Sequence, residues 1–271
     1  TNHITPGTEF IIGLDSYLSI AFEKHSNILF SGTNEPMEGE HKICHMIRSQ
    51  SHDYRNKNIM IYGLDADLIM LGLLLQAEDY NIFLYKETKH FQYISHVDEN
   101  QDYYFNMNEL AIQISELLNQ KDIQQSIYDY IFICFMCGND FMPHIPCINI
   151  RNNGVYNLIA KYIETSLTLI DKRNRTIQWK HFYHFIDNLE RQEKICVFEN
   201  IEWKLKNKMF AKTNTEEDKL NWLPCMDTEK ECYLKNHMDQ YNEYILETND
   251  VKELCINYLQ VLEWTWYYYN G

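Results

Sequence analysis

The sequence predicts an α/β protein: a largely parallel, doubly wound sheet flanked by helices, followed by a mainly helical extension. Short apolar runs alternate with segments of helical spacing over residues 1–150, which is the rhythm of βαβ units. Several runs lead into acidic residues, as buried parallel strands do where a sheet opens into a crevice. From residue 151 long helical patterns dominate. We therefore expect residues 1–150 to form an acidic-cluster core and residues 151–271 its helical extension.

The expected elements follow from local spacing. Thr8 has the side chain of a helix N-cap, and apolar residues recur at helical spacing from Phe10 to Phe22. A second helix is expected to carry Glu40 in its first turn, where the helix dipole favours a negative charge. Short apolar runs predict strands over residues 28–30, 59–62, 81–85, 91–95 and 130–136. Helical patterns predict helices over residues 68–75, 110–118, 155–166, 179–188 and 251–269, and a Lys/Glu-rich stretch over 204–230 predicts an exposed insertion.

Composition and cysteine usage limit the class of protein. A hydrophobic content of 45% and a charged content of 23% over 271 residues are typical of a globular chain, and no apolar run approaches the length of a membrane span. The polar opening is unlike a signal peptide, and the missing initiator Met indicates a fragment or a processed chain. Eight cysteines without a framework spacing indicate free thiols in an intracellular protein, with the cytoplasm favoured over the nucleus. Cys134 and Cys137 form a C-x-x-C, interpreted as core thiols rather than as a metal or redox pair.

The net charge of −15, from 24 basic and 39 acidic residues, argues against a broad nucleic-acid-binding face. Local basic stretches are expected to be solvated surface, and they lie at residues 172–175 and at Lys204, Lys206, Lys208 and Lys212. If the chain binds nucleic acid, most of the contacts to phosphate are expected to come from residues outside these basic stretches.

Three acidic clusters follow apolar runs, and they contain Glu38 and Glu40, Asp65 and Asp67, and Asp140. Carboxylates that meet at the edge of one sheet repel each other unless a cation lies among them. Their hard oxygen ligands favour Mg²⁺, with Mn²⁺ as the other candidate, and a pair of such ions commonly cuts phosphodiesters. The sequence therefore predicts a metal-dependent nuclease core.

The residue context of these clusters is long and specific. Residues 38–43, 62–71 and 138–146 closely resemble the nuclease domain of the Xrn family of 5′→3′ exoribonucleases, and residues 4–10 and 264–271 are similar to flanking parts of that catalytic core. The resemblance implies the acidic-sheet fold that Xrn, flap-nuclease and PIN-like domains share. It also implies that Glu38, Glu40, Asp65, Asp67 and Asp140 are the catalytic residues and bind one or two Mg²⁺ ions. One ion would activate a water and the other would stabilise the leaving 3′ oxygen. The implied substrate is single-stranded RNA with a 5′-monophosphate, degraded to mononucleotides.

Neighbours of the acids have two open interpretations. His41, Lys42, Asn139 and His144 could orient ligands or contact phosphate, or they could be structural packing around the site. Met37 stands where the family usually has Gly, so the turn before Glu38 is expected to differ. The family's earlier aspartates and basic 5′-phosphate pocket lie upstream, so a missing upstream segment or a partner chain is expected to supply them.

Two other functions remain open. A structure-specific DNA flap nuclease shares the acidic-sheet logic, but it usually follows its last aspartate with a Gly-rich helix–turns–helix, whereas residues 141–146 read Phe-Met-Pro-His-Ile-Pro. A non-catalytic RNA-binding or scaffold subunit would be expected if some of the five predicted catalytic acids had been replaced, but all five are present. The exoribonuclease is therefore the favoured prediction.

Overall fold

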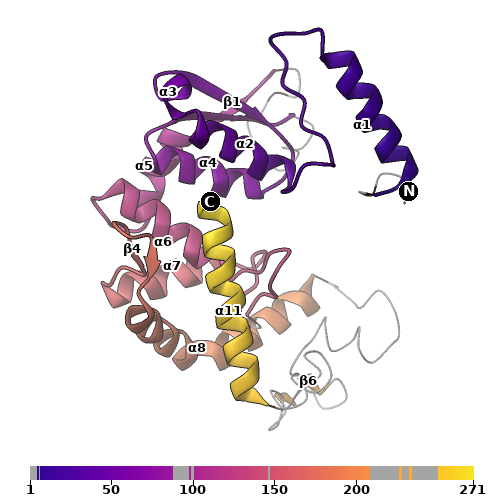
Figure 1. The fold of residues 1–271 in the computed structure, drawn as a ribbon. Helices are drawn as coiled ribbons and strands as arrows, with labels where there is room; N and C mark the ends of the chain where they lie inside the picture. The colour runs from indigo at the N-terminus through magenta and orange to yellow at the C-terminus, as the bar shows by residue number, and fades with distance from the viewer. Residues whose placement is uncertain are drawn as a thin grey trace. The chain divides into compact units, whose positions relative to one another are not determined.

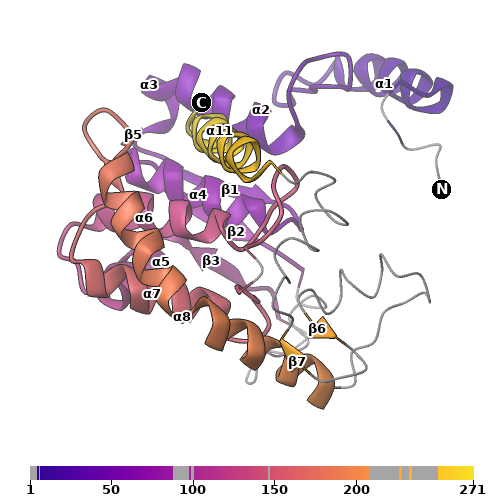
Figure 2. The ribbon, with the colours of Figure 1, turned by 90° about the horizontal axis from the view of Figure 1, so that it is seen from below.

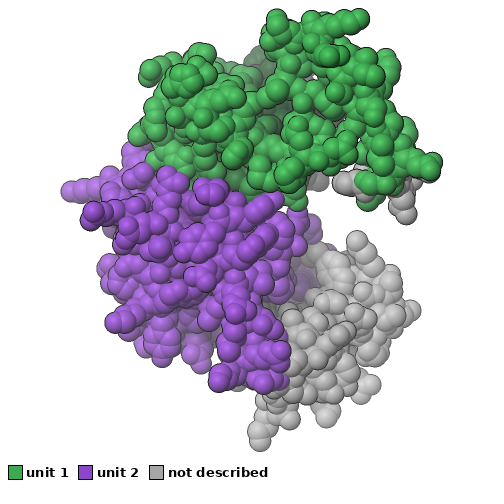
Figure 3. Space-filling model, in the orientation of Figure 1, with its two compact units in different colours: residues 1–105 green, residues 106–271 purple. Residues whose placement is uncertain are grey.

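A computed structural model gives the fold of the chain and describes residues 5, 7–87, 98, 101–145, 147–207, 226–227, 232–233 and 250–271. The chain divides into two compact units, residues 1–105 and residues 106–271, which are coloured separately in Figure 3. Each unit is described by itself below. The change of composition near residue 150 falls inside the second unit, and the functional division into residues 1–150 and 151–271 stays a prediction.

The first unit is built around one βαβ crossover. Strand β1 (Asn58–Tyr62) pairs in parallel with β2 (Asn81–Tyr85), and helix α4 (Asp67–Ala77) connects them (Figure 2). Strand β3 (Tyr104–Asn106) completes the sheet in the order β1-β2-β3. Helix α4 packs against β2, and none of its residues is exposed: seven of the eleven are buried and four half-buried, which explains why it is apolar on nearly every side.

Three further helices belong to the first unit. Helix α1 (Glu9–Phe22) begins at Thr8, whose hydroxyl accepts a hydrogen bond from the Ile11 amide as an N-cap does. Helices α2 (Gly39–Ser49) and α3 (Ser51–Tyr54) follow, and α2 packs against α4. The apolar core of this unit lies between α2, α4 and the strands, and it includes Ile47, Ile61, Leu71, Ile82 and Leu84.

The second unit is mainly helical. Helix α6 (Ile123–Phe135) is its centre, because α5 (Met107–Leu117) and α7 (Gly154–Thr165) both pack against it (Figures 1 and 2). Helix α8 (Trp179–Lys206) packs on α7. Two short antiparallel ribbons, β4–β5 (Ile170–Asp171 with Thr176–Ile177) and β6–β7 (Met226–Asp227 with Cys232–Tyr233), and the long helix α11 (Val251–Asn270) complete the described part.

A buried carboxylate ties three elements of this unit together. Asp129 on α6 is fully buried and accepts hydrogen bonds from the Tyr162 hydroxyl at 2.5 Å and from the Leu169 and Ile170 amides at 3.0 and 2.9 Å. Burial raises the pKa of Asp129 to about 6, because an apolar interior disfavours the charged form and the hydrogen bonds only partly oppose this. Asp129 thus fastens α7 and β4 to α6.

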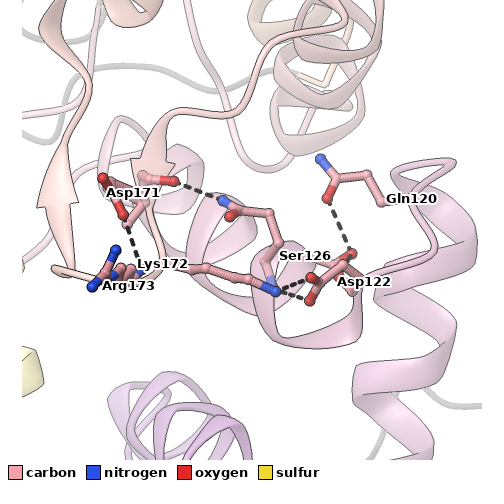
Figure 4. A network of polar contacts seen from close by, with 8 residues as sticks. Gln120, Asp122, Ser126, Asp171, Lys172 and Arg173 are labelled. Atoms are coloured by element: carbon pink, nitrogen blue, oxygen red, sulfur yellow. Dashed lines mark hydrogen bonds and ion pairs between the residues drawn. The ribbon is translucent and has the colours of Figure 1, made fainter.

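The surface beside this anchor carries a second set of polar contacts (Figure 4). The Lys172 ammonium pairs with the Asp122 carboxylate, and Asp171 accepts a hydrogen bond from the Arg173 amide at 2.9 Å. Asn174 also donates to Asp171, so three of the four residues of the basic stretch 172–175 are held by acids of the same unit. Lys172, Arg173 and Asn174 are exposed, in agreement with the prediction of a solvated surface.

Two predicted strands are wrong. The apolar run over residues 130–136 lies mostly within helix α6, which begins after an Asp122 N-cap that accepts a hydrogen bond from Gln125. A short apolar run cannot distinguish a buried strand from a buried helix, and α6 is buried along nearly its whole length. Residues 28–30 form no strand either. The predicted strand over 91–95 lies outside the described residues.

The mixed α/β class is confirmed, and so are the strands predicted over 59–62 and 81–85, which pair in parallel. The larger doubly wound sheet is not confirmed, because the described residues form one three-stranded sheet and two two-stranded ribbons. The predicted helices all exist, although α8 extends well beyond residue 188. Most of the Lys/Glu-rich stretch 204–230 lies outside the described residues. Within the described part of the chain, no helix is both long enough and apolar enough to cross a membrane.

The C-x-x-C lies at the end of α6 rather than in a strand. Cys134 is buried and Cys137 half-buried, and both are free thiols. Burial raises the pKa of Cys134 to about 12 and that of Cys137 to about 11, so both thiols stay protonated near neutral pH. This supports the interpretation as core thiols.

Candidate active site

The first acidic pair stands at the start of α2. Glu38 is the N-cap residue, with extended backbone angles, and its carbonyl accepts the Lys42 amide at 3.0 Å. Its side chain is exposed and makes no capping hydrogen bond, while Glu40 is half-buried in the first turn. The helix dipole favours negative charge at this end. Both carboxylates are therefore presented at a helix N-terminus, as predicted for Glu40.

Met37 precedes this pair in an unusual backbone conformation. Its φ is 77°, in the left-handed region that favours glycine, and its side chain is 46% exposed. The family's usual Gly would adopt this conformation without strain. This chain therefore carries a side chain at a position whose backbone suits glycine.

The loop that leads to Glu38 is held from two sides. Asp15 on α1 accepts hydrogen bonds from the Thr33 amide and hydroxyl, both at 2.6 Å, and the hydroxyl contact holds the pKa of Asp15 below its usual range. Lys42 on α2 donates to the Gly32 carbonyl at 2.5 Å. A Cβ atom at Gly32 would lie only 2.7 Å from the Asp15 carboxylate, so glycine permits this close approach. The contact of Lys42 supports its structural interpretation.

The second acidic pair follows β1, as predicted. After Tyr62 the chain turns at Gly63, whose amide donates to the Tyr85 carbonyl at 3.3 Å and where a Cβ atom would overlap Leu68. Asp65 is exposed in this turn, and Asp67 is the half-buried first residue of α4. The pair thus combines the end of a parallel strand with a helix N-terminus, which is the usual ligand-binding edge of such a unit.

His41 connects the two pairs. It lies on α2 with 8% of its surface exposed, and burial lowers its pKa, while the charges of Glu40 and Asp67 act in the opposite direction. Helices α2 and α4 pack against each other, so the two acidic pairs lie at or just before the N-termini of two neighbouring helices of the first unit. The burial of His41 agrees with structural packing, and a role in orienting ligands stays a prediction.

Asp140 belongs to the second unit and follows the end of helix α6, not a strand. The chain leaves α6 through Gly138, at a φ of 87°, where a Cβ atom would lie 2.9 Å from the His144 amide nitrogen. The Asn139 side-chain oxygen then accepts the Phe141 and Met142 amides at 2.9 and 3.1 Å. This turn leaves the Asp140 side chain exposed.

The other candidate neighbours also make contacts within their own units. His144 is exposed, and its Nδ1 lies 3.0 Å from the Ile145 carbonyl oxygen. The Asn139 Nδ2 atom is buried, and no described residue accepts a hydrogen bond from it. Asn139 therefore shapes the turn with its oxygen and retains a donor. Roles for these residues in orienting ligands or contacting phosphate stay predictions.

The donor chemistry of the acids fits Mg²⁺ or Mn²⁺, because all five side chains offer carboxylate oxygens alone. Within the described residues, no group of three or more His, Cys, Asp and Glu side chains is close enough to hold a metal ion. Four of the acids lie in the first unit and Asp140 lies in the second. The ligand roles of all five acids therefore stay predictions.

Sequence reasoning missed three residues that shape the site. Asp15 is a buried acid on a mostly apolar helix, and that placement was the available signal for a fixed partner. Trp264 and Tyr268, four residues apart on α11, contact the ring of Phe141 beside Asp140. Their spacing places them on one face of a helix, but nothing local indicates what that face covers.

Two family models match the chain. One, described as the N-terminus of the XRN 5′-3′ exonuclease, matches residues 1–87, and the other, described as the Xrn1 helical domain, matches residues 120–242. The second match begins close to the start of α6, in agreement with the helical character of the second unit.

Curated relatives are similar over more than half of the chain. The 5′-3′ exoribonuclease 2 of Kluyveromyces lactis is 33% identical over 59% of this chain and 20% of its own length, and the Saccharomyces cerevisiae protein of the same name is 33% identical over 57% and 19%. The human 5′-3′ exoribonuclease 1 is 35% identical over 60% of this chain and 11% of its own length. The chain thus spans about a fifth or less of these relatives. Two matching family models and these identities show that the chain belongs to the Xrn family of 5′-3′ exoribonucleases.

Proposed function

We propose that the chain is the nuclease region of a metal-dependent 5′→3′ exoribonuclease that degrades single-stranded RNA with a 5′-monophosphate to mononucleotides. One observation carries the proposal: Glu40 and Asp67 stand at the N-termini of two helices, α2 and α4, that pack against each other. Acids gathered at one edge in this way suit a cation. The names of the relatives supply the class of reaction.

The residues have distinct tasks in this proposal. Glu38, Glu40, Asp65, Asp67 and Asp140 would hold Mg²⁺ or Mn²⁺ through carboxylate oxygens. When bound, two such ions would supply an activated water and offset charge on the leaving 3′ oxygen. The N-termini of α2 and α4 keep negative charge favourable at Glu40 and Asp67. The Asp15 and Lys42 contacts hold the loop that precedes Glu38, so this side of the site is fixed before substrate arrives.

Recognition of RNA is proposed to depend on further protein. A net charge of −15 opposes the binding of a polyanion, and in the basic stretch 172–175 the Lys172 ammonium is already paired with Asp122. We propose that an upstream segment or a partner chain supplies the remaining acids and the basic pocket for the 5′-phosphate. We also propose a cytoplasmic location.

The test is hydrolysis of a 5′-monophosphorylated single-stranded RNA in Mg²⁺ and in EDTA, beside a 5′-hydroxyl RNA and a DNA flap. It compares wild type with Asp65→Asn and Asp140→Asn, and with the matched controls Asp53→Asn and Asp187→Asn, which change acids remote in sequence from the clusters. Circular dichroism checks the fold of each variant. We expect Mg²⁺-dependent release of mononucleotides that the two site variants lose and the two controls retain.

Other results lead to other functions. Preferential cutting of the flap would favour the structure-specific DNA nuclease. RNA binding without cleavage, in the chain alone and after the upstream segment is added, would favour the scaffold. Retained cleavage in both purified site variants would defeat the assignment of the acids.

A further inference from the structure

Three aromatic rings gather beside Asp140. Trp264 and Tyr268, one helical turn apart on α11, are stacked with their centroids 4.9 Å apart and an interplanar angle of 10°. Phe141, the residue after Asp140, meets both rings edge-on, at 4.9 Å and 77° from Trp264 and at 5.4 Å and 82° from Tyr268. Edge-to-face pairs at this distance attract each other and have a defined geometry. The Phe141 ring is therefore held in one place by α11.

Helix α11 is itself anchored to α6. Trp266 is fully buried, its indole N–H donates to the Arg175 carbonyl at 2.7 Å, and its ring meets Phe132 at 5.9 Å. Tyr269 meets Phe135, the last residue of α6, at 5.0 Å. One face of α11 thus packs on α6, while the face with Trp264 and Tyr268 contacts the loop that leaves α6. The same helix holds both the end of α6 and the loop.

The loop around Asp140 is also tied by its own backbone, because the Asn139 amide donates to the Met142 carbonyl at 3.0 Å and Met142 is buried. Among the described residues of this unit, none donates a hydrogen bond or ion pair to the Asp140 carboxylate, which is exposed. Its place depends on this closed turn, which Asn139 shapes with its amide and its side-chain oxygen, and on Phe141, which contacts the rings of α11. A catalytic carboxylate on a loop needs this kind of support, because displacements of about 1 Å can reduce the rate on the order of 100-fold.

We propose that Trp264 and Tyr268 are positioning residues, which fix the Asp140 carboxylate for catalysis by clamping the ring of Phe141. The consequence for catalysis rests on the proposed function. The clamp is a local property of the second unit and can be measured without any nuclease assay.

The first arm of the test is hydrogen exchange of the loop amides. Its variants are Trp264→Ala, Tyr268→Ala and the conservative Trp264→Phe, with Tyr267→Ala as control. Tyr267 lies on the same helix and is about as exposed as Trp264, at 46% against 49%, but among the described residues it makes no ring contact with Phe141. We expect the Phe141 and Met142 amides to exchange about tenfold faster in the two clamp variants, with the α6 amides still protected. Trp264→Phe and Tyr267→Ala should resemble wild type. Phe141→Leu removes the ring from the loop side, so the test stands even if an α11 variant fails to fold.

The second arm is RNA turnover in the full protein. Loss of the clamp should lower kcat by about 10- to 100-fold and raise the Mg²⁺ concentration for half-maximal rate, with the KM for RNA changed by less than about twofold. Trp264→Phe should restore most of the rate. A purely structural contact would not separate kcat from KM in this way.

The outcomes separate the two proposals. Unchanged exchange in Trp264→Ala, Tyr268→Ala and Phe141→Leu would overturn the clamp, and so would faster exchange with kcat unaltered. A wild-type protein without nuclease activity would overturn the proposed function, and the exchange arm would still decide whether α11 holds the loop.

Discussion

Replacing Asp129 with Asn should remove a pH dependence of stability that the wild type carries. The folded pKa of Asp129 is about 6, against an ordinary value of 3.8, because the carboxyl is fully buried between α6, α7 and β4. A raised pKa means that the folded state keeps its proton to higher pH than the unfolded state. The contribution of Asp129 is therefore complete below about pH 4 and is lost as the pH rises through about 6.

The size of the effect follows from the shift. About two pKa units at 1.36 kcal/mol per unit give about 2 to 3 kcal/mol of unfolding free energy lost between pH 4 and pH 7. An Asn side chain keeps an oxygen for the Leu169 and Ile170 amides and cannot ionise. In the variant this part of the pH dependence should vanish.

Urea denaturation at half-unit steps from pH 4 to pH 7.5 measures this pH dependence of the unfolding free energy. The control is Asp187→Asn on α8. A ¹³C titration of the Asp129 carboxyl checks the pKa directly. Parallel pH profiles for wild type and Asp129→Asn would refute the reasoning. They would mean that the Tyr162 hydroxyl and the two amides compensate the burial completely.

Three further predictions concern the acidic edge of the first unit. Met37→Gly should leave the free energy of unfolding equal or raise it by up to about 1 kcal/mol, as measured by urea denaturation. Relief of the left-handed φ is worth about 1 to 2 kcal/mol and exceeds the entropy cost of glycine. Met37→Ala, the control, should give no such gain. Asp15→Ala should speed hydrogen exchange of the Thr33 amide, because it removes the carboxylate oxygen that accepts from both the amide and the hydroxyl of Thr33. Since the pKa of Asp15 is lowered, the support it gives should weaken in wild type as the pH falls through that pKa. Asp53→Ala is the control, and equal exchange in the two variants would contradict the prediction. Mg²⁺ at ten times its Kd should stabilise wild type by about 1.4 kcal/mol, measured as a rise in the thermal unfolding temperature. This rise should vanish in EDTA and in Asp65→Asn. An equal rise in Asp65→Asn would remove Asp65 from the ligand set.

Local patterns predicted the elements that have one buried face or a clear cap. Thr8 marked the start of α1, and β1 and β2 were recognised from apolar runs bounded by polar turns. Helix α6 was not recognised as a helix from the sequence. It is buried on nearly every side, which removes the helical period of apolar residues, and its polar residues Gln125, Ser126 and Asp129 are buried as well. Asp122, its true N-cap, lies well before the apolar run that suggested a strand.

In the candidate site too, features that depend on chain neighbours were predictable, and features that depend on long-range packing were not. The placement of Asp65 and Asp67 after a strand followed from the sequence, because chain neighbours fix it. The contact of Asp15 with Thr33 and that of Phe141 with Trp264 join residues 18 and 123 positions apart in the sequence. Such pairs depend on how whole elements pack, and no local period indicates them.

The local surroundings of Asp140 differ from those of Glu40, and this leads to a last prediction. Glu40 lies in the first turn of α2, where the dipole makes its charge stabilising even without a metal, whereas Asp140 is exposed in a loop beyond the C-terminal end of α6. In EDTA, Glu40→Gln should therefore cost about 0.3 to 1 kcal/mol of unfolding free energy, and Asp140→Asn should cost none. Urea denaturation of the two metal-free variants compares them directly, and equal losses would contradict the assignment of different surroundings. If the prediction is correct, Asp140→Asn is the cleaner probe of function, because any loss of turnover in it comes without a loss of fold.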